Sequence, residues 1–100
     1  MVSEAEQTLK GKLKSEVGIT DWKALNAHFM RDALITVSND LDIVEVGLMI
    51  AEDNTEKMQR WLNEAKISKP TEKDVETWKE NSTEFTSLIL SPYVLIQPLP

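Results

Sequence analysis

The chain has 100 residues, 41% hydrophobic with three tryptophans, so it can bury one core and is predicted to form a single domain over 1–100, frayed at 1–5 and 98–100. Its net charge of −6 argues against nucleic acid and an anionic membrane surface as partners. The lack of cysteine excludes disulfides and thiolate chemistry, and neither a leader nor a membrane span is apparent. We therefore expect a cytoplasmic protein.

The first two predicted helices cover residues 3–17 and 22–31, and Gly18 is placed to end the first of them. The first helix has a narrow apolar stripe, which predicts that it packs on one side only. Thr20 or Asp21 is placed to cap the second helix. Apolar positions recur at helical spacing in both segments, as Leu9, Leu13 and Val17 in the first and Trp22, Leu25, Phe29 and Ala33 in the second.

The stretch 33–53 organises the rest of the chain. The β-branched run 34–37 predicts a buried strand, and the polar residues after it predict a turn. Asp42 and Glu45 have the spacing of a capping box, and the following helix, 43–51, is apolar around most of its circumference, so it should be covered on two sides. Gly47 lies within this apolar arc. A mid-helix glycine costs about 1 kcal/mol relative to alanine, so we expect another backbone to approach it closely.

Two further helices and a C-terminal strand region complete the prediction. A second capping-box pattern at 53–56 starts a helix that ends before Ile67, and Thr71 caps another that runs to about Glu80. The segment 85–97 is predicted as strand, in which Pro92 marks a kink, a bulge or a tight turn. The predicted fold class is therefore α+β, with about five helices around a small two- or three-stranded sheet that pairs the 33–37 strand with the 85–97 segment. The inward-facing positions of the two helices are Met58, Trp61, Leu62 and Ala65, and then Val75 and Trp78.

Four segments carry a resemblance to a known family: DWKAL, LDIVEVGLMIAEDN, the Trp61-Leu62 pair before ISKP, and the ending LSPYVLIQ. Together they resemble a small uncharacterised prokaryotic domain-of-unknown-function family, number two-two-eight-eight, over nearly the whole chain. The resemblance implies a bacterial cytoplasmic protein. It implies no activity, cofactor or catalytic residue.

Candidate chemistry is sparse in this sequence. His28 is the only histidine and lies off the apolar stripe of its helix, so we interpret it as a surface or boundary residue. Neither a phosphate-binding glycine loop nor a serine nucleophile elbow is present. The acids around the central helix could supply oxygen ligands to calcium or magnesium, although capping already explains most of them. The candidate metal ligands are Asp42, Glu45 and Glu52, with Asp40 and Asp53 beside them.

We consider two functions. The first is a non-catalytic domain that acts through protein–protein contact, with an unidentified protein partner or as a homodimer through the C-terminal strand. This function requires no cofactor, and it predicts an exposed apolar patch on the surface of the domain. The alternative is an enzyme, or a ligand- or metal-binding protein, that uses the acidic surface near Asp42, Glu45 and Glu52. That alternative needs a concave pocket with converging carboxylates.

Overall fold

A computed structural model describes residues 4–99 of the chain, with side chains from Leu9 onward. The helices are α1 (Glu4–Glu16), α2 (Trp22–Met30), α3 (Ile43–Ala51), α4 (Thr55–Asn63) and α5 (Glu72–Glu80). The strands are β1 (Gly18–Asp21), β2 (Leu34–Val37), β3 (Ile67–Ser68), β4 (Glu84–Leu90) and β5 (Tyr93–Pro98). The predicted single α+β domain with five helices is confirmed for the described residues.

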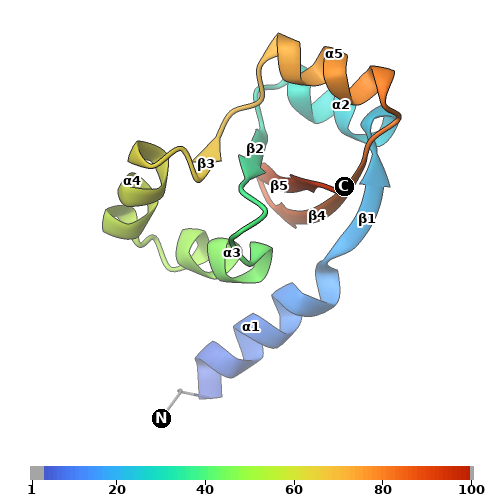
Figure 1. Cartoon of the computed structure of the whole chain (residues 1–100). Coiled ribbons are helices and arrows are strands. Elements are labelled where there is room, and N and C mark those ends of the chain that lie inside the picture. Colours follow the sequence, from blue (N-terminus) through green and yellow to red (C-terminus); the bar gives the residue numbers. More distant parts are fainter. Residues whose placement is uncertain (1–3, 100) are drawn as a thin grey trace.

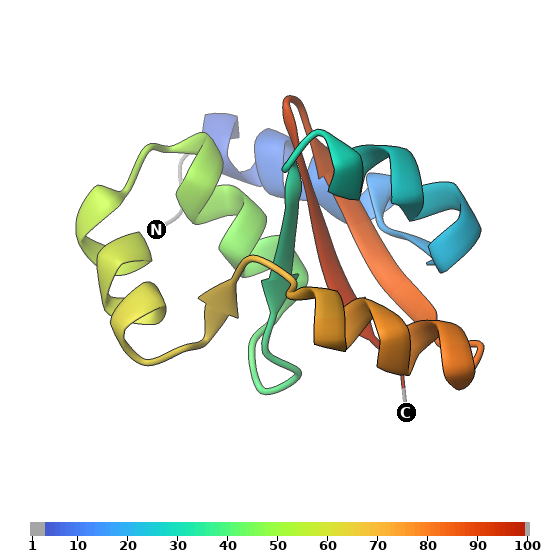
Figure 2. The ribbon, with the colours of Figure 1, turned by 90° about the horizontal axis from the view of Figure 1, so that it is seen from above.

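The strands form one mixed sheet in the order β1-β4-β5-β2-β3. β5 runs parallel to β2, and the other three pairings are antiparallel. Helices α2 and α5 cover one face of the sheet, while α1 and α3 cover the other, with α4 beside β3 (Figure 1). Figure 2 shows β2, β5 and β4 side by side, with α5 on one side and α3 on the other. The molecule therefore has three layers.

The sequence undercounted this sheet. The pairing of β2 with the C-terminal segment is confirmed, but the described chain has five strands rather than two or three. Gly18, expected to end the first helix, instead begins β1, and the segment at Ile67 forms β3. Both are short edge strands without apolar alternation, and they exist because β4 and β2 offer them a hydrogen-bonding edge.

The C-terminal segment is a hairpin. β4 and β5 pair antiparallel up to Leu90 and Tyr93, so Ser91 and Pro92 between them form a tight turn rather than a kink or bulge. The Ser91–Pro92 peptide bond is cis. The chain also stays in the sheet beyond Gln97, because Pro98 lies opposite Phe85 and the Leu99 N–H donates to the Glu84 carbonyl oxygen at 2.8 Å. The sequence placed both of these residues in a frayed end. Residues 1–3 and 100 lie outside the described part of the chain.

β5 explains why helices are needed on both faces. Leu95 belongs to one buried cluster, together with Val46 of α3 and Trp61 of α4. Its two neighbours in the strand belong to the other cluster, on the α2 and α5 side. Residues 94–96 of β5 are thus buried on both faces of the sheet. The second cluster consists of Trp22, Leu25, Leu34, Val75, Trp78, Phe85, Val94 and Ile96.

The caps follow the sequence only in part. Thr71 and Asp74 form the complete capping box that begins α5. At α4 the cap is Asn54, whose side chain accepts from the Lys57 N–H at 3.1 Å, rather than Asp53. In the same helix the predicted inward Leu62 is 50% exposed, because α4 contacts the domain along one side only.

Helix α3 is buried on two sides, as predicted, by α1 and α4 and by the sheet. Gly47 lies against β4: a Cβ atom at this position would be 2.7 Å from Leu88 Cδ2 and 3.3 Å from Leu90 Cδ1. The sequence had suggested that another backbone approaches Gly47 closely. The structure shows instead that the side chains of β4 make this close approach. No described helix has the length and apolar character that crossing a membrane requires.

We predict that Gly47→Leu lowers the free energy of unfolding by about 1–3 kcal/mol, because the new side chain overpacks the contact with Leu88. In a domain of this size that loss lowers the melting temperature by several degrees. Gly11→Leu is the matched control, since Gly11 is an exposed α1 residue with open space at its Cβ. The control should melt at or above the wild-type temperature, because leucine favours helix over glycine. Equal melting of the two variants would contradict the central place of α3.

Candidate functional site

Asp42 acts as the N-cap of α3. Its Oδ1 accepts a hydrogen bond from the Val44 N–H at 2.8 Å, which satisfies a donor that the helix start leaves unpaired. Glu45 does not complete the expected capping box. Instead its Oε1 accepts from Lys10 Nζ of α1 at 2.8 Å, so the pair joins the two helices on one face of the sheet. The hydrogen bond to Glu45, and then its charge, raise the pKa of Lys10.

Glu52 lies at the far end of the same helix, where it is the C-cap of α3. A nine-residue helix is about 13 Å long, so Glu52 is separated from Asp42 by almost the full length of α3. The neighbouring Asp53 has a positive φ of 56° in the turn to α4. The structure therefore does not bring the candidate ligands together, and among the side chains described, from Leu9 to Leu99, no three acid or histidine side chains are arranged to hold a metal ion.

Asp40 connects two loops that are distant in the sequence. Its carboxylate accepts hydrogen bonds from Lys66, before β3, and from Ser38, after β2. The Lys66 hydrogen bond, followed by that of Ser38, holds the pKa of Asp40 below its usual value. No local sequence pattern indicates this ion pair, because Asp40 and Lys66 are 26 positions apart.

His28 is half-buried near the end of α2. Its Nδ1 lies 2.5 Å from an Arg31 guanidinium nitrogen. Since guanidinium only donates, Nδ1 is the acceptor in this contact. The half-buried position agrees with the boundary placement that the sequence predicted.

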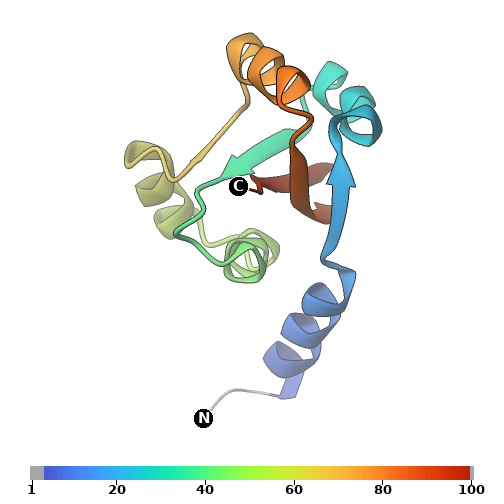
Figure 3. The ribbon, with the colours of Figure 1, turned by 45° about the vertical axis from the view of Figure 1, so that its right-hand side comes forward.

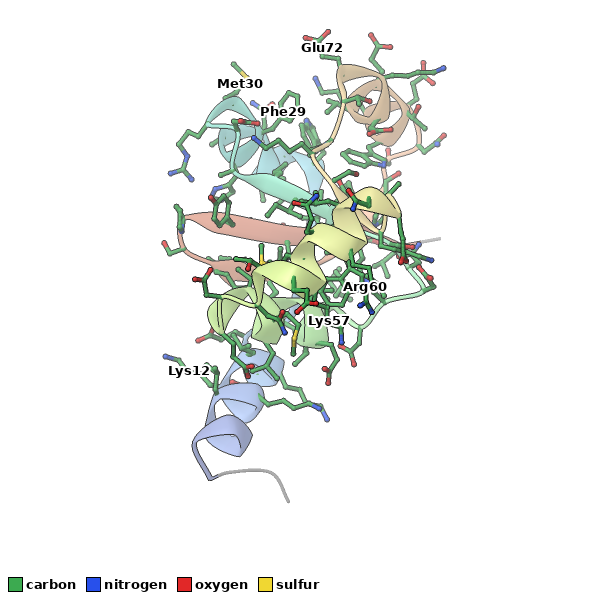
Figure 4. All side chains as sticks on the ribbon, turned by 90° about the vertical axis from the view of Figure 1, so that its left-hand side faces the viewer. Lys12, Phe29, Met30, Lys57, Arg60 and Glu72 are labelled. Carbon is green, nitrogen blue, oxygen red and sulfur yellow. The ribbon has the colours of Figure 1, made fainter. Side chains whose placement is uncertain are left out.

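An apolar groove, which we call the hairpin groove, lies where α1, the end of α3 and the β4–β5 turn meet. Its volume is about 460 Å³. Two side chains at the hairpin are large, apolar and exposed: Ile89 at 61% and Tyr93 at 42%. Lys12 and Glu16 of α1 are the charged residues that line the hairpin groove, and Figure 4 shows Lys12 projecting from that helix. The apolar lining residues are Leu9, Leu13, Ile50, Ala51, Ile89, Leu90, Pro92 and Tyr93.

The sequence did not reveal the hairpin groove, because its three segments are far apart along the chain and meet only in the folded structure. The local signals were a half-buried Leu9 on a narrow helical stripe and the apolar residues that flank Pro92. Each has an ordinary explanation as core or strand.

A second depression, of about 450 Å³, lies between the start of α2 and the end of α5. Trp22 and Trp78 line it, with ring centroids 5.8 Å apart, beside Lys23 and Lys79. Trp22 Nε1 is buried and has no hydrogen-bond partner among the described residues. All three tryptophans of the chain are nevertheless core residues, as predicted. Elsewhere, Lys57 and Arg60 project from the outer side of α4 (Figure 4) and line a smaller polar hollow.

The family model described as "Protein of unknown function (DUF2288)" matches residues 8–98. The chain belongs to this family. It is also similar to PA1075 from Pseudomonas aeruginosa, which has an NMR solution structure. The two sequences are 32% identical, and the match covers 100% of this chain and 93% of the PA1075 chain with a TM-score of 0.82. No curated protein matches the chain. For this DUF2288 domain the comparisons therefore support the fold and the family, and they supply no activity.

We predict that Asp40 contributes stability at neutral pH that is lost on acidification. Its pKa is lowered in the folded protein, so its contribution is complete above the ordinary aspartate pKa and disappears as the pH falls through the folded value. Asp40→Asn should therefore melt slightly below wild type at pH 7, and the difference should shrink as the pH falls below the ordinary aspartate pKa. Lys66→Met should reproduce this profile, and adding it to Asp40→Asn should have little further effect. A difference that is independent of pH would contradict the role of the ion pair.

We also predict that millimolar Mg²⁺, Mn²⁺ or Ca²⁺ leaves the melting temperature unchanged. These ions need several oxygen ligands within about 2.0–2.6 Å, and α3 holds Asp42 and Glu52 at opposite ends. A rise of several degrees that Asp42→Asn removes would show a metal site at the start of α3.

Proposed function

We propose that this domain works in the cytoplasm by binding another protein, and that it has no catalytic activity of its own. The hairpin groove is the observation that carries the proposal. It combines exposed Ile89 and Tyr93 with an apolar wall from two helices, and aromatic and aliphatic side chains of this kind form the centres of protein interfaces.

The arrangement of the acidic side chains near α3 also supports this proposal. An enzyme built on it would need carboxylates that converge on a substrate. Asp42 instead caps α3, Glu45 pairs with Lys10, and Glu52 lies at the opposite helix end. These acids position elements of the fold, and no observation favours the metal- or ligand-binding alternative.

Two features of the groove suit a protein ligand. Its apolar side chains come from regular secondary structure, namely α1, α3 and the hairpin, so the backbone of the groove is already ordered before binding. Its charged members Lys12 and Glu16 have opposite signs, and such groups favour a correctly oriented partner without setting affinity. The net charge of −6 favours a partner whose contact surface is not acidic.

A photo-crosslinking amino acid at Tyr93 tests this function in cells that produce the protein. We expect it to form a covalent adduct with a defined protein, and Ile89→Glu should reduce that adduct at least tenfold, because it places a charge in the apolar contact. Placing the crosslinker at Leu62 is the control, because this residue is similarly exposed on α4 and is not part of the groove. Identical adducts from positions 93 and 62, or none from position 93, would refute contact through the groove.

A further inference from the structure

The two edges of the sheet are built differently. β3, at one edge, is only two residues long and lies between Lys66 and Lys69, with Pro70 next. Short length, lysines and proline are the usual means by which proteins prevent an edge strand from pairing with another chain. β1, at the other edge, has four residues, Gly18–Asp21, with neither lysine nor proline. Figure 3 shows β1 along the outer side of the domain, directly after α1.

The middle of β1 carries an exposed apolar side chain. Ile19 is 69% exposed, although β-branched residues of a sheet are normally packed. Within the described chain, β4 is the only strand that pairs with β1, so the other side of its backbone faces outward. The one charged residue of β1, Asp21, lies at the end of the strand, where it caps α2. An edge without lysine or proline and with an exposed isoleucine near its centre is suited to adding a strand.

We propose that the added strand is β1 of a second copy of this chain, antiparallel across a two-fold axis at Ile19. This proposal rests on the protein-binding function and names a partner at a different surface from the hairpin groove. Around that axis the two Ile19 side chains lie directly opposite on one sheet face and cover each other. Gly18 of each copy then faces Thr20 of the other, and the open space around Gly18 admits it. The two sheets become one continuous sheet of ten strands.

The charges of β1 favour this register over one centred on Asp21. With Ile19 on the axis, the two Asp21 residues are four positions apart along the strands, about 13 Å. That separation exceeds the Debye length of about 8 Å at physiological ionic strength, so their repulsion is screened. A register centred on Asp21 would instead place two carboxylates directly opposite, which is unfavourable.

The homodimer contact expected from the sequence lies at the C-terminal strand, whereas the edge proposed for pairing is that of β1. β5 was expected to supply the pairing edge, but it lies between β4 and β2, so both of its edges are already used. A four-residue strand buries a small interface, so the β1 dimer should be weak and dependent on concentration. Since each copy carries a net charge of −6, added salt should strengthen it.

Sedimentation equilibrium on the full chain tests the pairing. Wild type should self-associate more strongly at 0.5 M than at 0.05 M NaCl, while Ile19→Lys and Ile19→Glu should each be monomeric because they place like charges on the axis. An equimolar mixture of these two variants should recover the dimer, because lysine then faces glutamate. Met30→Lys, a change at an equally exposed apolar residue of α2, should behave as wild type. A wild-type chain that is monomeric at millimolar concentration in high salt, or variants that fail to recover association on mixing, would overturn the proposal.

Cross-linking gives a second readout that does not depend on affinity. The chain has no cysteine, so Ile19→Cys introduces a single thiol. A short bis-maleimide should link Ile19→Cys into covalent dimers at least tenfold faster than Met30→Cys at the same concentration. Equal rates would show random collision and overturn the pairing. Ile19→Lys should leave the adducts at Tyr93 unchanged, so a failed dimer with intact adducts refutes only the β1 pairing.

Discussion

The structure depends on the burial of β5 from both sides. Leu95 enters the core shared with α3 and α4, while Val94 and Ile96 enter the core beneath α2 and α5. A strand that is apolar at successive positions is stable only when both faces of its sheet are covered. This requirement places helices on both faces, brings β2 alongside in parallel, and leaves β1 and β3 as the two outer strands.

Polar side chains then fix the connections around this centre. The Gln97 amide nitrogen, just after the buried part of β5, lies within hydrogen-bond distance of the Ser38 and Leu41 carbonyl oxygens, at 3.0 and 2.7 Å. It thereby holds the loop between β2 and α3, while Asp40 ties that loop to Lys66. The glutamine that ends the LSPYVLIQ motif thus has a structural role. The acids near α3 are likewise used in caps and helix-to-helix pairs, which leaves the apolar surfaces as the features open to partners.

Those surfaces differ in what they offer. The hairpin groove presents side chains from two helices and a hairpin and is suited to a partner of complementary shape, whereas the β1 edge presents main-chain groups and one isoleucine. Recognition through side chains can be selective for one protein, and recognition through a strand edge is geometric and symmetric. A domain with both surfaces could bind its partner as a pair of copies, and the two contacts would reinforce each other by raising the effective concentration.

The sequence by itself determined the α+β class, the five helices, the buried strand 34–37 and the buried central helix, because periodicity and capping are local properties. It also placed Trp22, Trp61 and Trp78 in the core. Only the tertiary structure decided the five-stranded sheet, since β1 and β3 have no hydrophobic signature and form against edges supplied by distant strands. The same holds for the partners of Glu45 and Asp40, for the side-chain contact at Gly47 and for the hairpin groove. Each of these features joins segments that are distant in the sequence, and no local sequence pattern indicates that such segments lie close together in the fold.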